Sequence, residues 1–359
     1  MPKNKVKSPA PKENKKPKTK KAKGMLSVSS WETIFDDYDT DEANPNPKNE
    51  VKLDINYEDL IGEGTHGKIY STNNPNICYK NFENAETGIQ PLKCIAKHFT
   101  FNRKSTNTCV HSMYEYILQR YIYKFIPKIS ELFSVPKAFQ FQYTDNRRQC
   151  GYFMTKLPSS IVHINVADPE RMQKVPGVGT EIGIKKFFGK DTKGAKEFVR
   201  SVAEIFSYMH FVLNIDGNDM EWIYSEPGFY LIDFDKVACF EFKLGFECIR
   251  KLDDTTYEEK KFTSINKIAF FLFTAMGSML MVPTRNNPEL QNEFIAGYAK
   301  YLDTHSELQQ QVYKSIVDNY IREYDCLLYT SPSPRDQRGS RIACCAWKKK
   351  RGGGGGGGG

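Results

Sequence analysis

The stretch of sequence with the clearest chemical potential is acidic: residues 215–235, IDGNDMEWIYSEPGFYLIDFD. It places six carboxylates in twenty-one positions, several of them beside apolar or aromatic residues such as Trp222 and Phe234. A carboxylate that is buried without a positive partner costs several kcal/mol of folding free energy. The pattern therefore predicts that something positive joins these carboxylates, and a metal ion is the first candidate.

A glycine-rich turn lies upstream in LIGEGTHGKIYS, where Gly62, Gly64 and Gly67 have the spacing G-x-G-x-x-G. A dinucleotide-binding fold would need a helix directly after the third glycine, whereas KIYS is typical of a strand. We therefore expect a hairpin that lies over nucleotide phosphates. A plain structural hairpin is the alternative.

Two lysines could accompany these glycines. Lys80 ends the apolar run of residues 77–79, so that a strand could direct its ammonium group toward phosphates, and Lys97 in CIAK is the alternative. Glu115 lies among apolar residues of a predicted helix. A buried glutamate at this position would need a cationic partner such as Lys80.

The elements that must position these residues are of two kinds. Residues 51–157 contain short β-rich runs joined by Asn, Asp and Pro turns, with one helix around residues 109–123. Residues 158–325 are expected to be mainly helical, because apolar residues recur at helical spacing before Leu213, at Phe198, Val202, Ile205, Met209 and Val212. The sequence thus predicts an α+β fold with a small β-rich N-lobe and a mainly helical C-lobe.

The two ends of the chain differ from its middle. Residues 1–24 contain ten lysines and one glutamate, and residues 1–50 are expected to form a disordered Lys-rich tail and an acidic linker. Residues 326–359 resemble a translated sequencing adapter and are also expected to be disordered. The tails 1–24 and 326–359 contribute +9 and +6 to the formal net charge of +8, which leaves −7 for residues 25–325. Contact with nucleic acid or another polyanion is therefore expected from the lysine-rich tail and not from the domain.

The cysteine pattern argues against a disulfide-stabilised protein, and the hydropathy pattern argues against a membrane-spanning one. The six cysteines of the domain form no CxxC pair, so reduced thiols in the cytoplasm or nucleus are expected rather than a disulfide framework. The most apolar stretch, residues 268–282, is too short to span a bilayer and suits a buried helix. No membrane partner is expected, and we expect a monomer.

The composition, rich in Lys, Asn, Tyr and Ile, suggests an AT-rich genome such as that of a large DNA virus. The cytoplasm or nucleus of a virus-infected host cell is therefore a further expected location of the protein.

In their order along the chain, these segments resemble the protein-kinase-like superfamily. MHFVLNIDGNDMEW resembles the kinase catalytic loop, with Asp216 at the catalytic aspartate and Glu221 at the metal-binding asparagine. LIDFD places Asp233 at the metal-binding aspartate of Asp-Phe-Gly. GYFMTKLP resembles the strand and hinge that hold adenine, with Met154 or Phe153 guarding the pocket.

The resemblance implies an ATP- and Mg²⁺-dependent phosphotransferase that moves the γ-phosphate to a hydroxyl acceptor of unknown identity. Asp233 and Glu221 would then hold the metal, and Asp216 would orient or deprotonate the acceptor. Lys80, held by Glu115, would neutralise phosphate charge. The expected nucleotide-binding residues are Gly62, Gly64, Gly67, Lys80 and Met154.

Departures from the kinase pattern leave two alternatives open. Ile215 replaces the arginine that often receives an activation-loop phosphate, and no Ala-Pro-Glu follows Asp233. The ending Asp-Phe-Asp is more like that of small-molecule phosphotransferases, and the pattern also resembles an uncharacterised, mostly fungal kinase-like domain. Glu221 adds a negative charge where kinases have asparagine, which favours a catalytically silent binding module, or pseudokinase. The other alternative is a nucleic-acid- or chromatin-associated protein that works through its lysine tail. Of the remaining carboxylates in residues 215–235, Asp219 and Glu226 are expected only to cap turns.

Overall fold

The computed structural model describes residues 53–63, 67–83, 108–143, 149–157, 161–175, 179–251, 257–302 and 306–324. The predictions for residues 1–50 and 326–359 fall outside these ranges. Gly64 and Lys97 lie outside them as well.

The N-terminal half forms a five-stranded antiparallel sheet in the order β1-β2-β3-β6-β5. Its strands are β1 (Ile55–Glu63), β2 (Lys68–Thr72), β3 (Ile77–Glu83), β5 (Ala138–Tyr143) and β6 (Gln149–Thr155). β1 pairs antiparallel with β2, with Glu63 opposite Lys68. The segment after the third glycine is therefore a strand, as predicted, and a dinucleotide-type helix is absent there.

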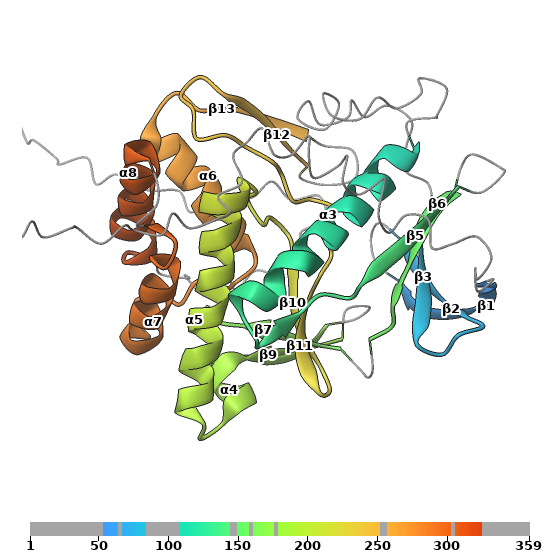
Figure 1. Ribbon diagram of the computed structural model, residues 1–359. Helices are drawn as coiled ribbons and strands as arrows, with labels where there is room; N and C mark the ends of the chain where they lie inside the picture. The colour runs from blue at the N-terminus through green and yellow to red at the C-terminus, as the bar shows by residue number, and fades with distance from the viewer. Residues whose placement is uncertain are drawn as a thin grey trace, which may run out of the picture.

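Helix α3 (Thr108–Ile129) packs against one face of this sheet and is the one helix that the sequence predicted there. Its residues Tyr116 and Ile117 contact Phe82 of β3 and Tyr152 of β6. Other residues of α3, including Leu118, belong to the main core of the C-terminal part. Figure 1 shows α3 between the N-terminal sheet and the C-terminal helices.

The C-terminal part contains a six-stranded mixed sheet in the order β4-β11-β10-β7-β9-β8, and a separate hairpin β12-β13. β4 pairs parallel with β11, and β7 pairs parallel with β9. The bounds are β4 (Phe133–Ser134), β7 (Val162–Asn165), β8 (Met172–Val175), β9 (Gly179–Gly183), β10 (Glu221–Ser225), β11 (Gly228–Ile232), β12 (Glu247–Lys251) and β13 (Tyr257–Lys261). The sequence analysis did not predict these strands in the second half, because runs of two to five residues are too short to show a period of two.

Helices make up most of the rest of the C-terminal part (Figure 1). They are α4 (Ile184–Phe188), α5 (Thr192–Tyr208) with its π-helical continuation η2 (Met209–Leu213), α6 (Ile265–Ser278), α7 (Pro288–Tyr298), and α8 (Glu307–Ile316) with its continuation η4 (Val317–Ile321). The predicted apolar stripe is confirmed on α5 and η2, which end at Leu213. α6 confirms the buried helix predicted near residues 268–282.

One large apolar core joins α3 and β4 to the mixed sheet and the C-terminal helices. Its largest fully buried side chain is Trp222 of β10. The architecture is thus α+β, with an antiparallel N-terminal sheet, a mixed second sheet and a mainly helical C-terminal part. Within the described part of the chain, no helix is both long and apolar enough to cross a bilayer.

Candidate active site

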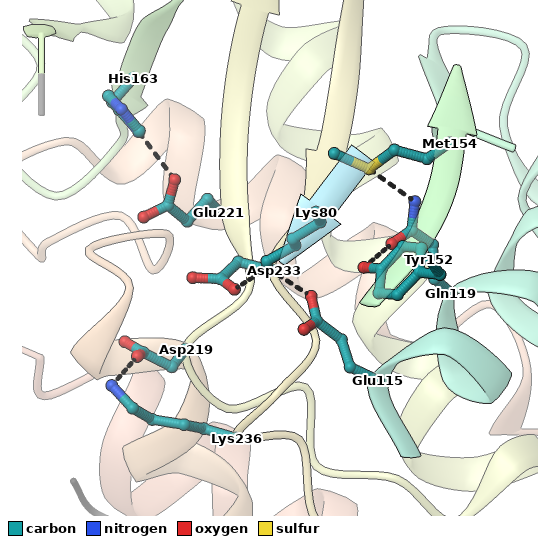
Figure 2. Close-up of polar contacts among 10 residues, drawn as sticks. All are labelled: Lys80, Glu115, Gln119, Tyr152, Met154, His163, Asp219, Glu221, Asp233 and Lys236. Carbon is teal, nitrogen blue, oxygen red and sulfur yellow. Dashed lines mark hydrogen bonds and ion pairs between the residues drawn. The ribbon is translucent and has the colours of Figure 1, made fainter. Parts of the chain in front are cut away.

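Strand β3 directs Lys80 toward helix α3, because alternate side chains share a face of a strand and Phe82, two residues on, packs against α3. The Lys80 Nζ atom lies 2.7 Å from Glu115 Oε1 and 3.1 Å from Asp233 Oδ1 (Figure 2). The predicted ion pair between Lys80 and Glu115 is therefore present. Asp233, which follows β11, joins it from the other half of the chain.

Burial and shared charge set the protonation of this triad. Glu115 is fully buried, and the resulting desolvation raises the pKa of its carboxyl, against the opposing effect of the Lys80 ammonium group. Burial alone would lower the pKa of Lys80, but the carboxylates of Asp233 and Glu115 outweigh it and raise that pKa well above its usual value. Lys80 therefore keeps its charge, and two carboxylates share one ammonium group.

The hairpin β10-β11 brings the two predicted metal ligands to the same end of the sheet. Glu221 begins β10 and pairs with Ile232, the residue directly before Asp233. The side chains of Glu221 and Asp233 are 22% and 28% exposed. Both carboxylates can therefore reach a ligand that approaches from solvent.

His163 of β7 is a partner of Glu221 that the sequence analysis did not single out. Its Nδ1 atom lies 3.7 Å from Glu221 Oε2, which makes an ion pair when the imidazole is protonated. β7 lies beside β10, with Ile223 opposite His163 in the register. The signal in the sequence was a single histidine within an apolar strand-like run, IVHIN, which by itself is more typical of a core position.

Asp216, the predicted catalytic aspartate, is fully buried. Its Oδ1 atom accepts hydrogen bonds from the backbone N–H groups of Asn218, at 3.0 Å, and Ala238, at 2.8 Å. Its own N–H donates to the Ala238 carbonyl at 3.0 Å. Gly217, with a φ of 67°, makes the left-handed turn between Asp216 and Asn218. In this arrangement Asp216 ties the loop before β10 to the segment after β11 and does not face solvent.

Asp219 and Lys236 form a second ion pair beside this framework (Figure 2). Their side chains are 38% and 17% exposed. The sequence analysis expected Asp219 only to cap a turn and did not consider Lys236, although a lysine directly after Asp-Phe-Asp was a signal that could have been used. The exposed carboxylate of this loop is thus Asp219 and not Asp216.

The described loop glycines, Gly62 and Gly67, differ in their surroundings. A Cβ atom at Gly67 would lie 2.7 Å from the backbone oxygen of Asn81, so the close approach of this residue, directly before β2, to β3 requires glycine. A Cβ atom at Gly62 would make only ordinary contacts with the Ile69 side chain. Packing therefore explains Gly67, and phosphate binding stays a prediction for both glycines and for Gly64.

Met154, and not Phe153, lies on the face of β6 that meets α3. Met154 packs with Tyr152 and the α3 side chains, whereas Phe153 packs with Tyr79 on the opposite face. A buried chain of hydrogen bonds fixes this region: the Tyr152 hydroxyl donates to Gln119 Oε1 at 2.7 Å, and Gln119 Nε2 lies 3.7 Å from Met154 Sδ (Figure 2). Met154 is therefore the better candidate to border a nucleotide base.

The carboxylates fit a magnesium ion that arrives with phosphates. Among the described residues, no three or more His, Cys, Asp and Glu side chains are grouped to hold a metal ion. Magnesium is usually bound through one or two carboxylates together with waters and substrate phosphates. Asp233 and Glu221 supply such a pair, next to the ammonium group of Lys80. The described residues therefore do not fit a metal ion that is held by protein groups alone.

Comparison with known proteins does not assign the chain to a family. No protein-family model matches the chain, and no curated protein matches it significantly.

Proposed function

We propose that this protein is a divergent kinase-like phosphotransferase that binds Mg²⁺ and ATP and transfers the γ-phosphate to a hydroxyl acceptor. The observation that carries the proposal is the contact of Lys80 with both Glu115 and Asp233. A lysine on a sheet strand, a glutamate on the adjoining helix and an aspartate after a C-terminal hairpin are the groups that kinases use to hold phosphates and metal.

Each group has a defined task in this proposal. Bound Mg-ATP supplies the phosphoryl group and the divalent charge that screens it. Lys80 neutralises phosphate oxygens, and Glu115 holds the ammonium group in position. Asp233 and Glu221 orient the metal end of the nucleotide, and Met154 borders the base.

The proposal is tested first by nucleotide binding. Mg-ATP is expected to raise the melting temperature of the full chain, by the equivalent of about 2.7 kcal/mol at a hundredfold excess over Kd. Asp233→Asn removes the charge that meets magnesium, so the Mg²⁺-dependent part of the shift should disappear while the shift with ATP in EDTA stays the same. Asp318→Asn, which changes an exposed carboxylate of η4, serves as the control and should leave both shifts unchanged.

If the wild-type chain shows no shift with Mg-ATP in differential scanning fluorimetry and no heat in titration calorimetry, the proposal is wrong. A shift that Asp233→Asn leaves intact would place the nucleotide elsewhere.

The burial of Asp216 favours a second candidate function, a silent kinase-like module that binds nucleotide without transferring phosphate. Two backbone amides occupy the Oδ1 atom of Asp216 and the side chain is fully buried, so Asp216 is poorly placed to accept a proton from a substrate hydroxyl. Release of inorganic phosphate from ATP by the purified chain distinguishes the two. Binding without release would support the silent module; release restored by Glu221→Asn would assign the silence to Glu221, and continued silence of that variant would agree with the burial of Asp216.

A further inference from the structure

The ion pair between Asp219 and Lys236 lies beside the phosphate-binding residues of the proposed site and has no part in the mechanism so far. Figure 2 shows the pair on the opposite side of Asp233 from the His163–Glu221 contact. The Asp233 carboxylate raises the pKa of Lys236 as well as that of Lys80.

Lys236 is held on a rigid turn. The neighbouring side chains of Phe234 and Val237 are buried. The Val237 carbonyl accepts a hydrogen bond from the Tyr114 hydroxyl of α3 at 2.5 Å. Ala238 is tied to Asp216 in both directions, as described above. Lys236 therefore starts from a fixed backbone, unlike a lysine of an ordinary surface ion pair.

The surroundings of Lys236 keep it charged and leave it available. Burial alone would lower its pKa, but the carboxylates of Asp219, Asp235 and Asp233 outweigh this effect and raise it. Its side chain is 17% exposed, close to the 12% of Lys80. The Asp233 carboxylate thus acts on two ammonium groups, that of Lys80 from the N-terminal sheet and that of Lys236 from the segment after β11.

Phosphoryl transfer needs positive charge on both sides of the group that moves, because negative charge spreads over its three equatorial oxygens. Lys80 would supply this charge from the N-terminal sheet, and Asp233 and Glu221 would hold a metal ion that supplies more. We propose that Lys236 binds the terminal phosphate of Mg-ATP from the other side, and that Asp219 positions Lys236. The proposal rests on the proposed function and adds to it a lysine that discriminates ATP from ADP.

The test compares the affinities of the full chain for Mg-ATP and Mg-ADP by titration calorimetry. Lys236→Met is expected to weaken Mg-ATP about tenfold or more, equivalent to about 1.4 kcal/mol, and to change Mg-ADP less than about twofold. Lys236→Arg should keep most of the preference for ATP, since it keeps the charge. Lys300→Met, which removes the ion pair with Glu204 on α5, is the matched control and should change neither affinity.

The outcomes separate this inference from the proposed function. If the wild type binds neither nucleotide, both fail. If it binds Mg-ATP and Lys236→Met weakens both nucleotides equally or neither, the proposed function stands and the inference is wrong. Should Lys236→Met fail to fold, Lys236→Gln keeps a hydrogen-bond donor for Asp219 and should show the same loss of discrimination. A Lys236→Gln variant that still prefers ATP as the wild type does would also refute the role of Lys236.

Discussion

At the scale of single residues, exposure decides which carboxylate of residues 215–235 can act. Asp216 is fully buried, whereas Asp219, three positions later, is 38% exposed. The spacing of acidic residues indicated that carboxylates gather near Asp233, and the apolar neighbours of Glu115 in its helix identified it as the partner of Lys80. It could not separate Asp216 from Asp219, because their directions depend on the left-handed turn at Gly217 and on backbone partners from beyond β11.

Glu115 should make stability depend on pH. Its pKa is raised by burial, to about 7 from an ordinary 4.5, so the folded state holds a proton more tightly than the unfolded state does. The contribution of protonated Glu115 to the free energy of unfolding is therefore complete below about pH 4.5, and it is lost as the pH rises through about 7. Urea denaturation between pH 4.5 and 8 should show the free energy of unfolding falling for the wild type relative to Glu115→Gln, on the order of 1–3 kcal/mol.

The control for this measurement is Glu226→Gln, a change at an exposed carboxylate. Its curve should run parallel to that of the wild type. Parallel curves for wild type and Glu115→Gln would contradict the raised pKa of Glu115.

At the scale of elements, length decides what the sequence could predict. The apolar stripe of α5 includes buried residues such as Phe198 and Ile205 and continues into η2. Its helical period in the sequence made it predictable. The strands β7 to β11 have four or five residues each, and their apolar runs carry no comparable period. Their pairing also depends on partners far away in sequence, such as β4 with β11. Local patterns do not contain that information.

The packing of α5 against α7 supplies a sharp element-scale test. A Cβ atom at Gly297 of α7 would lie 2.4 Å from the backbone oxygen of Arg200 and 3.0 Å from the Ala203 Cβ atom of α5. Gly297→Ala should therefore force the helices apart and lower the free energy of unfolding by about 1–3 kcal/mol. Chemical denaturation of the two chains measures the difference.

Gly277 of α6 is the matched control, because a Cβ atom there would meet only the Phe273 ring, at 3.8 Å. Gly277→Ala should be neutral or stabilise by up to about 1 kcal/mol, since alanine favours helix over glycine. Equal effects of the two substitutions would mean that helix propensity, and not the α5–α7 contact, governs Gly297.

At the scale of the whole molecule, charge divides the chain into two basic tails, of which residues 1–24 are the more basic, and an acidic body. Residues 25–325 carry −7, whereas residues 1–24 carry +9. Deleting residues 1–24 should therefore abolish salt-sensitive binding to a labelled DNA duplex and leave the thermal shift with Mg-ATP unchanged.

Fluorescence anisotropy at two salt concentrations measures this effect. For the full chain, affinity should fall about a thousandfold or more between 50 and 200 mM salt if six or more phosphates are contacted. A chain of residues 25–325, without either basic tail, that still binds the duplex tightly at physiological salt would show that the acidic body has a nucleic-acid-binding face of its own.

The parallel pairing of β4 with β11 has a consequence for how the protein is made. The five strands of the N-terminal sheet are all available once Thr155 has left the ribosome, but Phe133 and Ser134 of β4 can pair only after Phe229 and Tyr230 have been synthesised. Until then the nascent chain carries Phe133, which is 2% exposed in the finished protein, without its partner sheet. Apolar surface that is exposed in this way favours aggregation until its partner sheet has formed. A released chain that ends at residue 157 would contain every strand of the first sheet but would lack the partner strand of its apolar β4 segment.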